Sequence, residues 1–201
     1  MATLPSQPFG GRFLGEYRVA ALTGTMAAGA GANIEVCQFR NATAARIAYV
    51  SRVTFFMSSL GTGFTAGLAQ VNAIMARSST VVGSGGSAID LSPSNAMQTA
   101  MPTSFMDGAI RIATTAGLTA ATQTLDNNPL AQNWFTVSTA TNTVQNANHP
   151  YLIYPPEDAL GHPVGVAYQE GLIFRATVPA TGTWQIVFNL RWSEYTLASN
   201  P

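Results

Sequence analysis

The residues that could bind a metal are few and widely spaced. Cys37, His149 and His162 are the only cysteine and histidines of the chain. A structural zinc site needs three or four nitrogen or sulfur ligands at short spacings, and these residues lie in separate segments. Each histidine also precedes a proline, which is typical of a turn. We therefore expect no zinc site.

Two clusters of oxygen-bearing side chains offer a case for calcium. The first is Asp126, Asn127 and Asn128, and the second is Glu157 and Asp158. Calcium takes six or more oxygen ligands, so the two clusters would have to meet. Asp and Asn side chains also bond their own backbone in turns, and turn formation is the simpler interpretation. We expect no metal and no cofactor.

The acidic residues show no spacing that is diagnostic of catalysis. A glycosidase needs two carboxylates held apart in a cleft, whereas Glu16, Glu35, Glu170 and Glu194 lie on or beside expected strands. The GSGGS stretch at 83–87 lacks the spacing of a nucleophile elbow. The chain has no lysine, which excludes a lysine phosphate-binding loop and Schiff-base chemistry. We expect a protein that is not an enzyme.

Charge is scarce in this sequence. Charged residues make up 9% of the 201 residues and the net charge is zero, against a usual charged share of about a quarter. Such a chain lacks the positive field of a nucleic-acid binder. The first residues do not resemble a secretory signal, and arginines interrupt the apolar runs, so we expect no membrane partner and synthesis in the cytoplasm. A surface poor in charge is weakly protected against association, which favours assembly.

Short alternating segments separated by Gly, Pro and Asn predict about eight antiparallel strands. No amphipathic helix is evident, so the fold class is all-β, a jelly-roll or β-sandwich. In the segment 46–57, the residues expected to share one phase are Ile47, Tyr49, Val53, Phe55 and Met57. Residues 79–108 are expected to form a long irregular loop. A single jelly-roll domain would span 14–201, after an extended N-terminal arm at 1–13.

The segment 171–192 (GLIFRATVPATGTWQIVFNLRW) predicts a hairpin around the PATGT connection. Alternation places eight side chains on one buried side: Leu172, Phe174, Ala176, Val178, Trp184, Ile186, Phe188 and Leu190. Phe188→Asp should therefore be close to fatal for folding. Gly182 suits a turn position with positive φ, and Pro179 ends the first strand.

The opposite side of this expected hairpin is a candidate assembly face. It would carry Ile173, Arg175, Val187 and Asn189, and Arg175→Ser should be mild in the isolated subunit. A second candidate contact is the N-terminal arm, in which Pro5, Pro8, Phe9 and Phe13 could lie in a groove of a neighbour or of a capsid.

Three stretches resemble a widespread set of tailed-phage virion proteins. They are GTGFTAG (61–67), IRIATTAGLTAATQTLDNNPLA (110–131) and EGLIFRATVPATGTWQIVFNLRWSEY (170–195). The chain is similar to jelly-roll head decoration, or cement, proteins. The resemblance implies a homotrimer on the capsid exterior with the major capsid protein as its partner. It implies no catalytic residues.

Two other functions stay open at this point. A tail, neck or baseplate component would have the same kind of sequence. A carbohydrate-binding, receptor-binding module would instead use an aromatic platform, for which the candidates are Trp134, Trp184, Trp192, Tyr151, Tyr154 and Tyr168.

Overall fold

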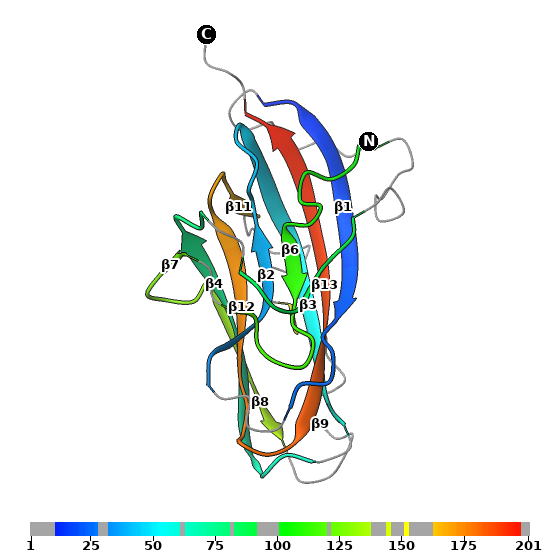
Figure 1. Cartoon of the computed structure of the whole chain (residues 1–201), viewed down its shortest axis with the longest axis vertical. Coiled ribbons are helices and arrows are strands. Elements are labelled where there is room, and N and C mark those ends of the chain that lie inside the picture. Colours follow the sequence, from blue (N-terminus) through cyan, green and yellow to red (C-terminus); the bar gives the residue numbers. More distant parts are fainter. Residues whose placement is uncertain are drawn as a thin grey trace.

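The structure is a computed structural model that describes residues 11–27, 32–60, 63–80, 83–91, 101–119, 122–137, 144–145, 151–152 and 163–197. Its regular elements within these ranges are all β-strands, arranged in two antiparallel sheets (Figure 1). The predicted all-β sandwich is therefore confirmed.

The smaller sheet, called sheet A, contains five strands. β13 (Thr183–Thr196) lies between β1 (Phe13–Leu22) and β3 (Arg46–Leu60) and pairs with both along most of its length. Two short strands, β10 (Tyr151–Leu152) and β11 (Val164–Val166), pair with the far edge of β3. The three long strands therefore form the body of sheet A.

The larger sheet, called sheet B, contains eight strands. β12 (Gly171–Thr177) is central and pairs with β2 (Ile34–Arg40) and β4 (Gly67–Arg77). Beyond β2 lie β6 (Ile110–Ile112) and β5 (Ser87–Ala88). Beyond β4 lie β8 (Ala131–Val137) and β9 (Val144–Gln145), and β7 (Thr124–Leu125) also pairs with β4.

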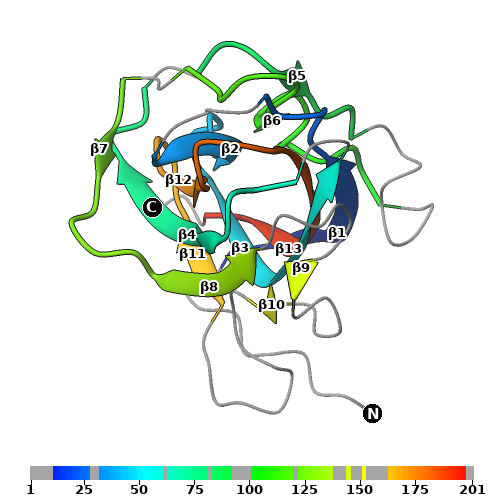
Figure 2. The ribbon, with the colours of Figure 1, turned by 90° about the horizontal axis from the view of Figure 1, so that it is seen from below.

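Successive long strands alternate between the two sheets. β1 is in sheet A, β2 in sheet B, β3 in sheet A and β4 in sheet B, and the chain later crosses back from β12 to β13. Seen along the long axis, the strands surround a common interior (Figure 2). This repeated crossing is what gives the sandwich its jelly-roll character.

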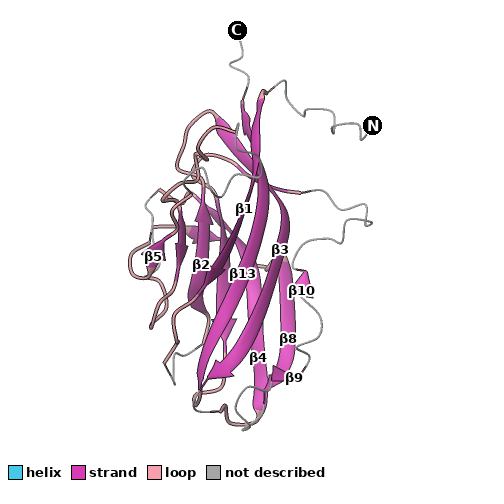
Figure 3. Cartoon of the chain, turned by 90° about the vertical axis from the view of Figure 1, so that its right-hand side faces the viewer, coloured by secondary structure: helices cyan, strands magenta, loops and turns pink. Residues whose placement is uncertain are grey.

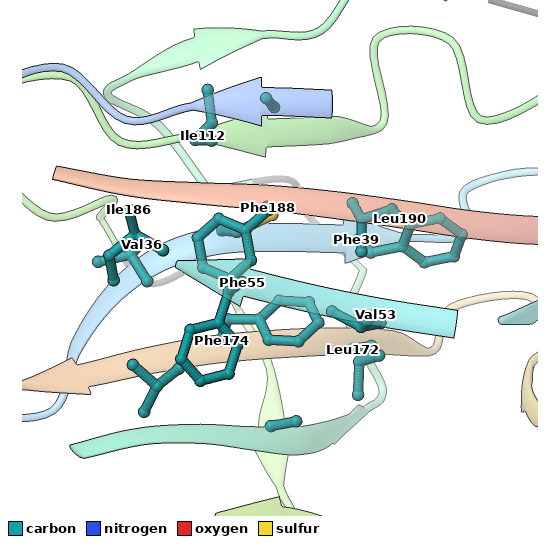
Figure 4. Close-up of a cluster of buried hydrophobic side chains, with 14 of the residues drawn as sticks. Val36, Phe39, Val53, Phe55, Ile112, Leu172, Phe174, Ile186, Phe188 and Leu190 are labelled. Carbon is teal, nitrogen blue, oxygen red and sulfur yellow. The ribbon is translucent and has the colours of Figure 1, made fainter. Parts of the chain in front are cut away.

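The interior is built from alternate residues of the facing strands. All eight side chains expected on the buried side of 171–192 are buried. Phe188 of β13 lies 5.2 Å from Phe174 of β12 and 6.1 Å from Phe55 of β3, measured between ring centroids (Figure 4). Such aromatic contacts at 4.5–7 Å add to the stability gained from burial.

The predicted hairpin at 171–192 is wrong. β12 pairs with β2 and β4, whereas β13 pairs with β1 and β3, so the two strands belong to opposite sheets. The connection at 178–182 therefore crosses the sandwich. Gly182 has the expected positive φ of 93°, and a Cβ there would lie 3.0 Å from the Phe64 backbone nitrogen. Alternation specifies which side chains are buried, but it does not specify which strand is the hydrogen-bonded neighbour.

A β-bulge changes the predicted phase of β3. The register shifts where Arg191 pairs with Arg52 and Trp192 pairs with Val50, which leaves Ser51 without an opposite residue. An extra residue reverses the alternation on either side of it. Val53, Phe55 and Met57 therefore face the interior as expected, whereas Ile47 and Tyr49 are half-buried on the other side.

The two segments expected outside the sandwich are only partly described. Pro5, Pro8 and Phe9 lie outside the described residues. The prediction that Phe13 belongs to the arm is wrong: it is the first residue of β1, and its ring centroid lies 5.4 Å from that of Tyr195. The described parts of 79–108 are irregular apart from β5 and an isolated bridge at Ser84, and they bury Leu91 and Met106 in the core.

Candidate assembly surface

The predicted assembly face is divided between the two sides of the molecule. Ile173 and Arg175 lie on the outer side of sheet B, and Val187 and Asn189 lie on the outer side of sheet A. The reason is that β12 and β13 belong to different sheets. Ile173 is also only 1% exposed. These four residues therefore do not form one surface, and that prediction is wrong.

The chain covers the middle of the outer side of sheet B with its own loops. The Leu118 N–H donates to the Glu35 carbonyl oxygen at 2.8 Å, and the Thr119 N–H donates to the Ser84 carbonyl oxygen at 2.9 Å. A Cβ on Gly83 would lie 2.7 Å from the Gln38 side-chain amide, so a glycine is needed at this contact. Under this cover, Glu35 and Gln38 are buried.

Glu35 is the centre of a buried polar network. Its Oε1 accepts hydrogen bonds from Arg175 at 2.8 Å and from Gln123 at 2.7 Å. Its Oε2 accepts one from Gln38 at 2.5 Å. A buried carboxylate is stable only when it is paired and hydrogen-bonded. Arg175 therefore compensates a buried charge of its own subunit, which is a structural role.

Glu194 is a second buried carboxyl, at the end of the core near Trp192. It accepts hydrogen bonds from Trp192 Nε1 at 2.9 Å, from the Phe105 N–H at 3.1 Å and from the Ser104 hydroxyl. Burial raises the pKa of this carboxyl, and the hydrogen bonds offset part of that effect. Glu194 thus fastens the segment around Ser104 to β13.

The metal-ligand candidates do not come together in the described part of the chain. Cys37 is fully buried in the core, and burial raises the pKa of its thiol to about 12. Asp126 accepts hydrogen bonds from Arg77. The remaining candidates lie outside the described residues: His149, His162, Glu157 and Asp158. Among the residues that are described, no group of three metal-ligating side chains occurs, and no helix could cross a membrane.

The aromatic candidates for a sugar platform are also separated. Trp184 and Trp192 are fully buried in the core, so neither can contact a ligand. Trp134 on β8 is 52% exposed, and Tyr168 before β12 is 46% exposed. Tyr154 lies outside the described residues, and Tyr151 is described only as part of β10.

The outer side of sheet A carries exposed apolar side chains. Leu22, Val187 and Phe56 stand directly opposite one another on β1, β13 and β3, the strands that Figure 3 shows side by side. Leu22 is 52% exposed and Phe56 is 40% exposed. We call this set the apolar row. Single exposed apolar residues are ordinary, but here three apolar side chains adjoin one another on neighbouring strands, so the outer side of sheet A is a candidate assembly surface.

A second apolar group lies at the opposite end of the same side. Phe13, Tyr195 and Ile47 are opposite one another on the three strands. The Tyr195 ring also lies 5.5 Å from that of Tyr49, measured between centroids. We call Phe13, Tyr195 and Ile47 the aromatic row. Val187 and Phe13 are predicted contact residues, but the sequence does not show that either belongs to a row. The members of each row come from three distant segments, and the bulge at Ser51 hides their common side.

No family model matches the chain, and no curated protein matches its sequence.

Proposed function

We propose that this chain is a virion structural protein of a tailed phage. In this proposal it is a capsid decoration protein that stabilises the head by bridging neighbouring capsomers as a homotrimer. Its partners are other copies of the chain and the major capsid protein. The observation that carries the proposal is the apolar row on the outer side of sheet A, with Leu22 and Phe56 exposed.

The physical requirements of such a protein agree with this surface. A decoration protein acts by adding interface area, and a specific interface buries on the order of 1,600 Å² in total. Such an interface needs a rigid body and exposed apolar contacts. The two-sheet core provides the first, and the rows of sheet A provide the second. The resemblance to cement proteins points to the same role.

The experiment combines solution mass with binding to heads that lack the chain. We expect a trimer by light scattering and saturable binding to undecorated heads of the encoding phage. Phe56→Ser should weaken association or head binding, because it removes an exposed apolar contact. Trp134→Ser is the matched control, since it removes an exposed aromatic residue from the other sheet. A strictly monomeric chain without affinity for heads would contradict the proposal.

A tail, neck or baseplate location is distinguished by copy number. A decoration protein should be present in many copies spread over the head. A tail or neck component should be present in few copies at one end of the particle. Quantitative mass spectrometry of purified virions measures this ratio directly.

A second candidate function is glycan binding at Trp134. Trp134 is half-exposed and stands opposite Gln70 of β4, so an aromatic face and an amide are adjacent on one side of sheet B. Aromatic rings combined with hydrogen-bonding groups suit sugar rings. A glycan array with the wild type and Trp134→Ala tests this function, which requires binding that the variant loses.

A further inference from the structure

A row of three arginines crosses the outer side of sheet A. Arg18 of β1 is opposite Arg191 of β13, which in turn is opposite Arg52 of β3. Residues directly opposite on neighbouring antiparallel strands project to the same side, with Cβ atoms about 4.5–5.5 Å apart. The three guanidinium groups therefore emerge from adjacent positions. We call them the arginine row.

Within the described part of the chain, Arg18 is the member of this row that has no ion pair. Glu16 is the neighbouring carboxylate, and its Oε1 accepts a hydrogen bond from Arg191 Nε at 2.6 Å. Arg18 is exposed. Like charges directly opposite one another in a sheet are destabilising. Charged residues are few in this chain, and three adjacent arginines do not help the fold. We therefore look for their role outside the subunit.

We propose that the arginine row binds carboxylates on a partner protein, while the apolar row and the aromatic row pack against apolar side chains on either side of them. The inference rests on the proposed function, in which that partner is the capsid shell. The guanidinium group suits this task because its planar fork binds a carboxylate through two hydrogen bonds. Buried between two apolar rows, such contacts would be shielded from water and would fix the orientation of the bound subunit.

A second copy of this chain is a poor match for the row. Most carboxylates in the described part of the chain already accept hydrogen bonds from the same chain. These are Glu16, Glu35, Asp107, Asp126, Glu170 and Glu194. A face-to-face pair related by a two-fold axis through the row would also place arginine against arginine. The acidic partner is therefore a different protein.

Nucleic acid is also a poor match. Binding to a phosphate backbone needs a continuous band of positive charge, whereas this row is one residue deep. It is bordered on one side by the alanine and amide row of Ala20 and Asn189, and on the other side by Glu16. The chain as a whole has no net charge.

The test uses undecorated heads of the encoding phage and a reversal of one charge. Arg18→Glu should weaken binding to heads at least tenfold in a cosedimentation titration, because it places a carboxylate against carboxylates. Arg111→Glu is the matched control. Arg111 lies on β6 of sheet B, so this variant makes the same change in net charge away from sheet A and should bind like the wild type. Both variants should remain trimers by light scattering.

The partner's chemistry is tested by converting the carboxylates on the heads to amides with carbodiimide and glycinamide. Wild-type binding should weaken on amidated heads, because the carboxylates that pair with the row have been removed. Arg18→Glu should weaken less than the wild type or bind better, because amidation also removes the repulsion that this variant introduces. Wild-type binding to untreated heads should weaken as salt rises. Equal responses of the wild type and Arg18→Glu to amidation would overturn the inference.

The remaining outcomes separate this inference from the proposed function. If the wild type and Arg18→Glu bind heads equally, the inference fails and the proposed function stands. If Arg18→Glu dissociates the trimer, the row contacts a second copy and the inference also fails. If a short DNA duplex displaces the wild type from heads, the arginine row binds phosphate and the inference is overturned. If the wild type binds no heads, the proposed function fails, together with the inference that rests on it.

Discussion

Phe174 and Phe188 meet across the interior of the sandwich with ring centroids 5.2 Å apart, although their strands belong to different sheets. The two strands are consecutive in the chain, and residues 178–182 connect β12 to β13. The contact therefore joins sheet A to sheet B across the core.

Replacing Phe188 with alanine tests this contact. Phe188 is fully buried, and removing a buried phenylalanine side chain costs about 3–5 kcal/mol of unfolding free energy. Val187→Ala is the matched control, because Val187 is the preceding residue and faces outward; it should cost about 1 kcal/mol or less. Urea denaturation of both variants measures the difference. Equal losses would mean that the assigned sides of β13 are wrong.

Replacing Arg175 with serine should strongly destabilise the isolated subunit. This reverses the expectation from the sequence, because Arg175 contacts Glu35, whose side chain is 4% exposed. Removing one partner of a buried ion pair leaves an uncompensated charge and costs about 3–5 kcal/mol. Denaturant unfolding of Arg175→Ser measures this cost.

Two further variants show whether the loss of stability comes from the buried pair or from removing any arginine. Arg77→Ser removes an exposed arginine that contacts Asp126 and Glu170, and it should cost only about 0–1 kcal/mol. In the double variant Glu35→Gln with Arg175→Ser, no buried charge remains, so the loss should be smaller than the sum of the two single losses. Strict additivity would show that the pair is not coupled.

Glu194 should lower the free energy of unfolding as the pH rises above 4.5, the ordinary pKa of a glutamate carboxyl. Burial raises the pKa of Glu194 above 4.5. Between 4.5 and the raised value, the folded protein holds a proton that the unfolded chain has lost, so unfolding releases that proton and becomes easier as pH increases. The free energy of unfolding should therefore fall with rising pH in the wild type more than in Glu194→Gln. Urea unfolding of both proteins across this pH window measures the difference. A pH-independent difference would contradict the assignment.

Cys37 should react with thiol reagents only after unfolding. Its thiol is fully buried, and burial raises its pKa to about 12, so neither access nor thiolate is available in the folded state. We expect labelling by a disulfide reagent to follow global unfolding, with rapid reaction only in denaturant. Since the chain has one cysteine, the signal reports this site alone. Rapid labelling of the native protein would show that the core opens locally.

The sequence predicts the strands and their buried sides better than their neighbours. In 171–192, the alternating pattern correctly identifies Phe174, Ala176, Trp184 and Phe188 as buried. The same alternation is satisfied by a hairpin and by two strands that face each other across a core. Only the pairing partners of β12 and β13, which lie far away in the chain, decide between these arrangements.

The candidate surface was harder to predict for a related reason. Leu22, Phe56 and Val187 come from three separate segments, so no local pattern links them. The bulge at Ser51 also reverses the sides of β3, and no residue type in that stretch announces it. The sequence places Arg175 on an exposed face because a charged residue in an alternating strand normally faces water. The cover that Gly83 and Gln123 provide over Gln38 and Glu35 is a tertiary feature.

The most direct test of the whole account is a cryo-electron microscopy reconstruction of the encoding phage particle. We expect the two-sheet sandwich in groups of three on the outside of the head. The outer side of sheet A, which carries Arg18 and Phe56, should contact a neighbouring protein. A particle that contains no copy of the chain would contradict its central claim.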